Sequence, residues 1–177
     1  MKRRLFLGVY ILLILARIFS IFFFVKWPLI TWIVVYLLDV FDCPFAIWGG
    51  IKFSGYQKID KTVDFITRLY LVYTAWILGW PYLIFLGLVI IRLVGDLLYL
   101  FSGKEKYMFY FPNLVEFFFP AYFFYNKYLI FENNSLVYLI ILALLSAILK
   151  TINEYYLHVK LDIGKKLRAY YLKIIKT

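Results

Sequence analysis

Four aspartates in the first half of the chain have the spacing of a shared cation site. Asp39 and Asp42 are three residues apart, and Asp60 and Asp64 are four residues apart. On an α-helix, either interval places both side chains of the pair on one face. The segment 43–59 between the pairs contains one proline and three glycines. We therefore expect it to fold the helix that carries Asp60 and Asp64 back beside the helix that carries the first pair. All four carboxylates would then converge.

Such a group of carboxylates indicates metal-dependent chemistry. In a low-dielectric environment, neighbouring carboxylates repel one another strongly unless cations neutralise them. Their oxygens are the ligands that hard divalent cations such as Mg2+ and Mn2+ prefer. Two such cations about 4 Å apart could bridge a diphosphate and stabilise both attack and departure at one phosphorus. The sequence therefore predicts a site for Mg2+ or Mn2+ that can act on a diphosphate.

The composition indicates which elements must carry these aspartates. Of the 177 residues, 65% are hydrophobic and 23% are aromatic, and the mean hydropathy of +0.84 lies far above that of a soluble domain. A membrane-spanning helix needs ~20 apolar residues. Apolar runs between breaks predict six such helices, near residues 5–25, 28–47, 60–79, 82–102, 108–131 and 136–157. We therefore predict an all-α membrane protein in which residues 1–177 form a single integral membrane domain, a bundle of six transmembrane helices with short loops.

The basic residues predict the orientation of this bundle. In a six-helix topology, most lysines and arginines outside the helices fall on one side, which the positive-inside rule makes cytoplasmic. Both termini would then lie in the cytoplasm, and the aspartates near that face. The basic tail 158–177 carries apolar residues at roughly helical spacing, which predicts an amphipathic helix at the membrane surface or, alternatively, a disordered tail. The net charge of +10 indicates anionic phospholipids as partners, and not nucleic acid.

Further ionisable residues fall at a similar depth within the predicted helices. Counted from the outer helix ends, they and the aspartates occupy one layer ~12 to 24 Å deep; the additional members are Arg17, Arg68, Arg92, Asp96, Glu116 and Lys150. A common depth favours a polar cavity open to the cytoplasm. Separate ion pairs are the alternative, because Arg92 with Asp96 and Asp64 with Arg68 each have the favourable four-residue spacing.

The aspartate pattern resembles the signature of the CDP-alcohol phosphotransferase family, also called CDP-alcohol phosphatidyltransferases. That signature is D-x2-D-G-x2-A-R-x8-G-x3-D-x3-D, and the chain is similar to it in all four aspartates and in Ala46. It departs from the signature in having Cys43 and Tyr56 where the family has glycines, and Ile47 where the family has arginine. These departures bear on the nucleotide pocket more than on the metal ligands.

The resemblance implies a membrane enzyme of phospholipid synthesis. Such an enzyme transfers a phosphatidyl or phospho-alcohol group from a CDP-linked donor to an alcohol hydroxyl and releases CMP, with Mg2+ or Mn2+ as cofactor. The metal ligands would be Asp39, Asp42, Asp60 and Asp64, with Asp64 also the catalytic base. The resemblance also implies a homodimer.

Four further residues are expected to contact the substrate. Ala46 matches the motif. Because residue 47 is not an arginine, another cation must meet the phosphates, and Arg68, one turn beyond the last motif aspartate, is our candidate. Arg92 and Lys104 resemble elements downstream of the family's motif. These residues complete the predicted site.

Two other functions are weighed against this one. Intramembrane prenyltransferases also use aspartate-rich motifs and Mg2+ on a diphosphate, but they resemble bundles of about nine helices, which this chain is too short to supply. A non-catalytic family member, or a transporter that binds a cation without turnover, remains an alternative.

Overall fold

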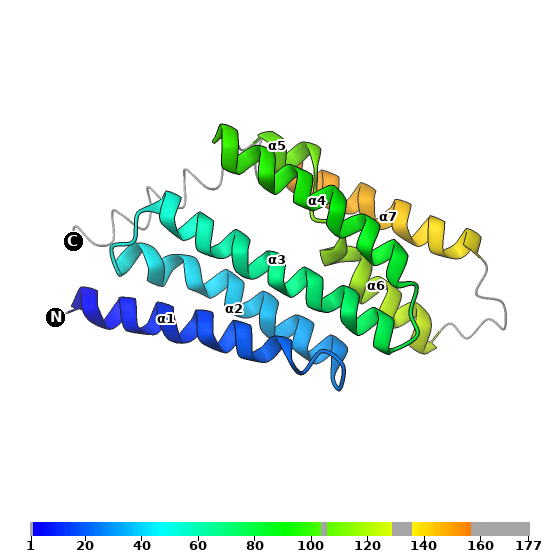
Figure 1. Ribbon diagram of the computed structural model, residues 1–177, viewed down its shortest axis with the longest axis horizontal. Helices are drawn as coiled ribbons and strands as arrows, with labels where there is room; N and C mark the ends of the chain where they lie inside the picture. The colour runs from blue at the N-terminus through cyan, green and yellow to red at the C-terminus, as the bar shows by residue number, and fades with distance from the viewer. Residues whose placement is uncertain (1, 104–105, 129–135, 157–177) are drawn as a thin grey trace. The chain divides into compact units, whose positions relative to one another are not determined.

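The computed structural model describes residues 2–103, 106–128 and 136–156, and every regular element in these ranges is a helix (Figure 1). The predicted tail 158–177 lies outside the described residues. The helices are α1 (Lys2–Ile21), α2 (Pro28–Trp48), α3 (Phe53–Ile77), α4 (Tyr82–Ser102), α5 (Lys106–Tyr110), α6 (Val115–Tyr128) and α7 (Leu136–Glu154). The all-α prediction is confirmed for this part of the chain.

The described residues divide into two compact units. The first extends to Leu78 and contains α1, α2 and α3, and the second begins at Gly79 and contains α4 to α7. The single domain expected from the sequence stays a prediction.

In the first unit, α1 packs along α2, and both helices contact α3. The α2–α3 connection is shorter than the sequence predicts, because α3 begins at Phe53 instead of near residue 60, whereas α2 ends at Trp48, close to the predicted residue 47. Residues 49–52 make the turn, and Gly50 has φ +82°, a conformation that glycine adopts at little cost. The side chain of Arg3 donates to the carbonyls of Gly49 and Gly50, which places the basic start of α1 beside this turn.

In the second unit, the helix expected at 108–131 is divided. Its first part is α5, and α6 starts only at Val115, because Pro112 in the intervening segment 111–114 cannot continue a helix with normal hydrogen bonds. The core is aromatic: Phe85, Phe118 and Phe119 have no exposed surface. Trp80 is buried against this core.

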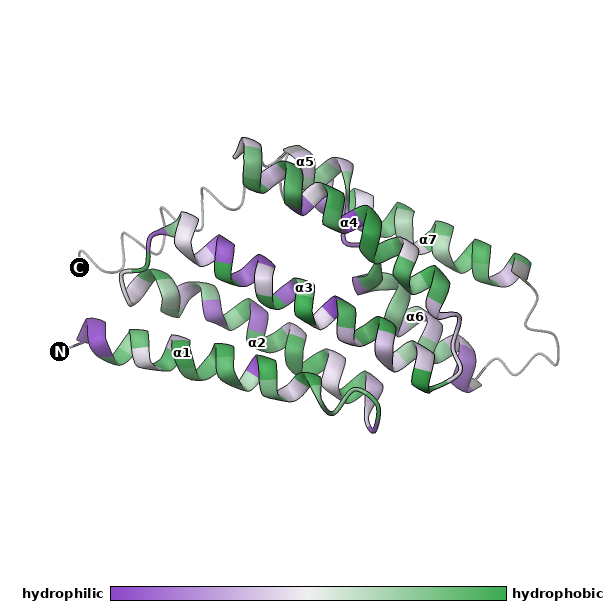
Figure 2. Ribbon diagram, viewed as in Figure 1, coloured by the Kyte–Doolittle hydropathy of each residue, from purple (hydrophilic) through white to green (hydrophobic). Residues whose placement is uncertain are grey.

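Four of the described helices are long and apolar enough to cross a membrane, namely α1, α2, α4 and α7, which indicates a membrane protein. The helix α3 has 25 residues but is more polar than these four, and α6 has only 14 residues. Figure 2 shows this contrast, with hydrophilic residues along α3 and mostly hydrophobic residues along α1 and α4. The membrane character of the prediction is therefore supported, and the count of six spans stays a prediction.

Gly95 on α4 lies against Phe111 and tests the packing of the second unit. A Cβ at Gly95 would lie 2.5 Å from the Cβ of Phe111, whereas a Cβ at Gly87 on the same helix would have no atom within 4 Å. We expect Gly95→Ala to destabilise the protein by ~1–3 kcal/mol through overpacking, which a lowered melting temperature in detergent would reveal. Gly87→Ala is the matched control and should be neutral or stabilising by up to ~1 kcal/mol, since alanine favours helix. Equal melting temperatures for the two variants would contradict this packing.

Candidate functional site

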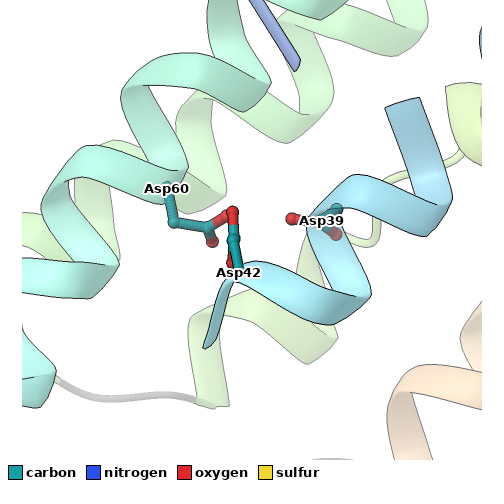
Figure 3. A group of neighbouring side chains, drawn as sticks. All are labelled: Asp39, Asp42 and Asp60. Carbon is teal, nitrogen blue, oxygen red and sulfur yellow. The ribbon is translucent and has the colours of Figure 1, made fainter. Parts of the chain in front are cut away.

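Carboxylates from two helices meet inside the first unit. Oxygens of Asp39 and Asp42 on α2 and of Asp60 on α3 all lie within 4.8 Å of one another. Figure 3 shows the three side chains directed toward a common point from the two helices. Asp42 and Asp60 are buried, and Asp39 is partly exposed. The face-to-face placement follows from the three-residue spacing on α2 and from the return of α3 along α2.

The guanidinium of Arg17 on α1 lies at the centre of the cluster. Its Nη1 atom is 2.7 Å from Asp39 Oδ1, 3.1 Å from Asp42 Oδ2 and 3.2 Å from Asp60 Oδ1. Its Nη2 atom forms an ion pair with Asp64 Oδ1. Arg17 therefore contacts all four motif aspartates while only 2% of its surface is exposed. From the sequence, Arg17 is one member of the charged layer, and no spacing rule relates it to aspartates on other helices.

Two further side chains contact the aspartates. The Tyr56 hydroxyl donates to Asp42 Oδ1 at 2.8 Å, so the residue that replaces a motif glycine supplies a hydrogen bond to a motif aspartate. Lys61 Nζ lies 3.0 Å from Asp60 Oδ2 and 3.5 Å from the second oxygen of Asp64. No helical spacing relates Tyr56 to Asp42 on another helix, whereas Lys61 directly follows Asp60 in the sequence.

Among the residues that the structure describes, the ion pairs of this cluster leave an excess of negative charge. With all groups ionised, four carboxylates carry −4, and Arg17 with Lys61 carries +2, which leaves −2. A buried excess of two negative charges is costly, and one divalent cation would cancel it. Three carboxylates within 4.8 Å are also a donor set suited to Mg2+ or Mn2+. The residues present therefore fit a divalent cation.

The predicted substrate-binding residues occupy different places. Ala46 is fully buried in a core cluster with Tyr10 and Tyr56, where its small side chain permits close packing. Arg68 is buried on α3, and its Nε donates to the backbone carbonyl of Asp64 at 3.1 Å. Lys104 lies outside the described residues.

Arg92 belongs to the second unit, in an ionic cluster of its own. Its Nε atom is 3.1 Å from Asp96 Oδ1, which is the four-residue pair considered from the sequence. Its Nη1 atom donates to the backbone carbonyls of Met108 at 3.2 Å and Phe111 at 3.0 Å, and these bonds join α4 to α5 and to the segment after it.

The other members of this second cluster come from α6 and α7. Lys150 forms ion pairs with Glu116 and, at 3.2 Å, with Glu154. Glu154 also lies 4.0 Å from Arg92. Buried charges in the second unit are thus paired with one another, as the ion-pair interpretation of the charged layer expects.

A shallow apolar groove of about 320 Å³ runs between α1 and α3 beside the aspartates. Its wall is formed mainly by isoleucines, and its lining residues neighbour Arg17, Asp60 and Asp64 in the sequence; they are Ile14, Ile18, Lys58, Ile59, Thr62, Val63 and Ile66. The groove therefore offers apolar surface with a lysine and a threonine close to the carboxylate cluster.

The contacts of Arg92 predict a structural role that can be measured. We expect Arg92→Gln to destabilise the protein by about 3 kcal/mol, because breaking a buried ion pair leaves its partners uncompensated. The readout is the melting temperature in detergent, with Lys127→Gln on the exposed side of α6 as the control. Unchanged stability together with weaker binding of a CDP-linked donor would instead favour the substrate-binding role expected from the sequence.

Comparisons with protein-family models, with curated proteins and with solved structures give no match for this chain. The family resemblance therefore stays a prediction that depends on the motif. The observation available to support it is the geometry of Asp39, Asp42, Asp60 and Asp64.

Proposed function

We propose that this protein is a membrane enzyme that transfers a phosphatidyl or phospho-alcohol group from a CDP-linked donor to an alcohol hydroxyl and releases CMP. The observation that carries the proposal is the convergence of the motif aspartates from α2 and α3 within one buried cluster. Residues 21 positions apart, such as Asp39 and Asp60, come together here with the spacing of the family signature. Catalysis would require Mg2+ or Mn2+.

The aspartates would bind the cofactor through their inward-facing oxygens. Asp39, Asp42 and Asp60 supply the close set of carboxylate oxygens, and the Tyr56 hydroxyl holds Asp42 in place. A bound divalent cation would neutralise the diphosphate of the donor and polarise the phosphorus under attack. The burial of Asp42 and Asp60 keeps water away from these ligands, which strengthens their electrostatic interactions.

Asp64 would act as the general base. It lies one turn beyond Asp60 on α3, at the edge of the cluster, and its side chain retains 19% exposure, which leaves an approach for the acceptor. Asp64 accepts the proton of the alcohol hydroxyl while the alcohol oxygen forms the new bond to phosphorus. The bond between that phosphorus and the CMP oxygen breaks, and CMP leaves with the electron pair.

The surroundings of the cluster favour a lipid-linked substrate. An acyl chain would fit the apolar groove between α1 and α3, with Lys58 near the headgroup phosphate. The basic start of α1 meets the α2–α3 turn through Arg3, so the positive-inside rule supports a cytoplasmic N-terminus and a site near the cytoplasmic face. Six transmembrane spans, a cytoplasmic C-terminus and a homodimer belong to the same proposal.

A non-catalytic cation-binding protein or a transporter is the second candidate. The observation that favours it is Arg17, whose guanidinium already contacts all four aspartates. The presence of the buried Ile47 at the position of the signature arginine also favours the non-catalytic candidate. Turnover decides between the two candidates.

The decisive experiment measures release of labelled CMP from CDP-diacylglycerol, in Mg2+ or Mn2+, with a panel of alcohols. We expect the wild-type protein to release CMP with at least one alcohol. Asp64→Asn should lower the rate by ~100-fold or more, because the side chain keeps its shape but can no longer accept the proton. Chelation of the divalent cation should abolish the reaction.

Glu116→Gln is the matched control for Asp64→Asn. Its side chain has a similar exposure, 22% against 19%, and also pairs with a buried cation, but it lies in the second unit. We expect this variant to keep its activity. Absence of CMP release from wild-type protein with every alcohol, or an active Asp64→Asn variant, would exclude the enzymatic proposal.

A further inference from the structure

Arg17 and a divalent cation would need the same carboxylate oxygens. Arg17 Nη1 lies 2.7–3.2 Å from oxygens of Asp39, Asp42 and Asp60, which are the same three residues whose carboxylates are grouped closely enough to hold a metal ion. Mg2+ requires its oxygens at ~2.0–2.1 Å, which leaves no room for a guanidinium between the same ligands. The two cations therefore exclude each other at the centre of the cluster.

The region around Arg17 also holds unused hydrogen-bond donors. The Nε atom of Arg17 and the hydroxyl of Tyr10 are buried, and neither has a hydrogen-bond partner among the described residues. Arg17 is 2% exposed and Tyr10 is 3% exposed, and the Tyr10 ring packs against Tyr56, whose hydroxyl donates to Asp42. Buried donors without partners are costly, so an acceptor brought by a ligand would be favoured here.

The chemistry of such a ligand follows from these donors. A guanidinium presents its donors in a planar fork that matches the oxygens of a phosphate. The arginine of the family signature is absent, since Ile47 stands in its place and is buried. Arg17 reaches the same cluster from α1, so this chain has an arginine near the aspartates although none is present in the motif.

We propose that Arg17 is an exchangeable cation of this site: it neutralises the aspartates in the metal-free protein, yields their oxygens to a divalent cation, and then contacts a phosphate of the nucleotide substrate. This inference depends on the proposed function, because it assumes that the cluster receives a divalent cation and a diphosphate. It adds a residue of α1 to a site otherwise formed by α2 and α3.

The first test measures binding of Mn2+ alone to the full chain in detergent, through the electron paramagnetic resonance signal of free Mn2+. We expect Arg17→Gln to bind Mn2+ about tenfold more tightly than wild type, because removal of a competing positive charge near the ligands favours the remaining cation. Lys150→Gln, which removes an equally buried and ion-paired cation from the second unit, should bind Mn2+ as wild type does.

The second test measures binding of CDP at saturating Mn2+. Here Arg17→Gln should bind about tenfold more weakly than wild type, since the charge-assisted contact to phosphate is lost. Arg17→Lys keeps the positive charge but lacks the planar set of donors of a guanidinium, so its affinity for CDP should lie between those of wild type and Arg17→Gln. If Arg17 were purely structural, its replacement would not be expected to raise the affinity for Mn2+ and lower the affinity for CDP.

The outcomes separate this inference from the proposed function. Equal Mn2+ affinity of wild type and Arg17→Gln would overturn the exchange and leave the metal site standing, whereas absence of Mn2+ binding to both would overturn the metal site as well. Unchanged CDP affinity would overturn the phosphate contact. If Arg17→Gln is monodisperse only when purified with Mn2+, the divalent cation replaces Arg17 as inferred; aggregation with and without Mn2+ would show that Arg17 is structural and contradict the exchange.

Discussion

Four ionised carboxylates can share one small, largely buried volume only if cations lie among them. The cost is electrostatic, because repulsion between like charges at short distance grows as the dielectric constant of the surroundings falls. In this protein Arg17 at the centre and Lys61 at the edge offset half of that charge. The packing of α1, α2 and α3 depends on this arrangement, since each of the three helices contributes at least one charged member.

The same requirement explains why the short α2–α3 turn matters. Asp60 and Asp42 can meet only if α3 returns closely along α2, and Gly50 permits the reversal within residues 49–52. Close contact is then maintained by Ala46 and by Tyr56, whose hydroxyl binds Asp42. Tyr56, at a position where the signature that the chain resembles has glycine, thus has a structural use, because it adds a hydrogen-bond donor to Asp42.

The two ionic clusters of the chain differ in a way that bears on function. In the second unit, Arg92 donates to two backbone carbonyls and forms an ion pair with Asp96, and Lys150 has two glutamate partners. These contacts hold the helices of the second unit together. In the first unit, one guanidinium is shared by four carboxylates. With Lys61 included, the described ion pairs leave two negative charges when all groups are ionised, so the cluster retains capacity for a further cation. The proposed chemistry depends on that difference.

The sequence by itself determined the helical, apolar character of the chain and the convergence of the two aspartate pairs, because hydrophobic length and helical periodicity act over short distances. It also indicated Arg92 with Asp96, whose spacing is local. The break of the predicted helix 108–131 at Pro112 is also a local effect, which the apolar pattern alone did not show. The early start of α3 at Phe53 and the position of Arg17 among the aspartates were decided by the tertiary structure. These features depend on how helices distant in the sequence pack together, and no spacing along the chain encodes a contact between a residue of α1 and carboxylates of α2 and α3.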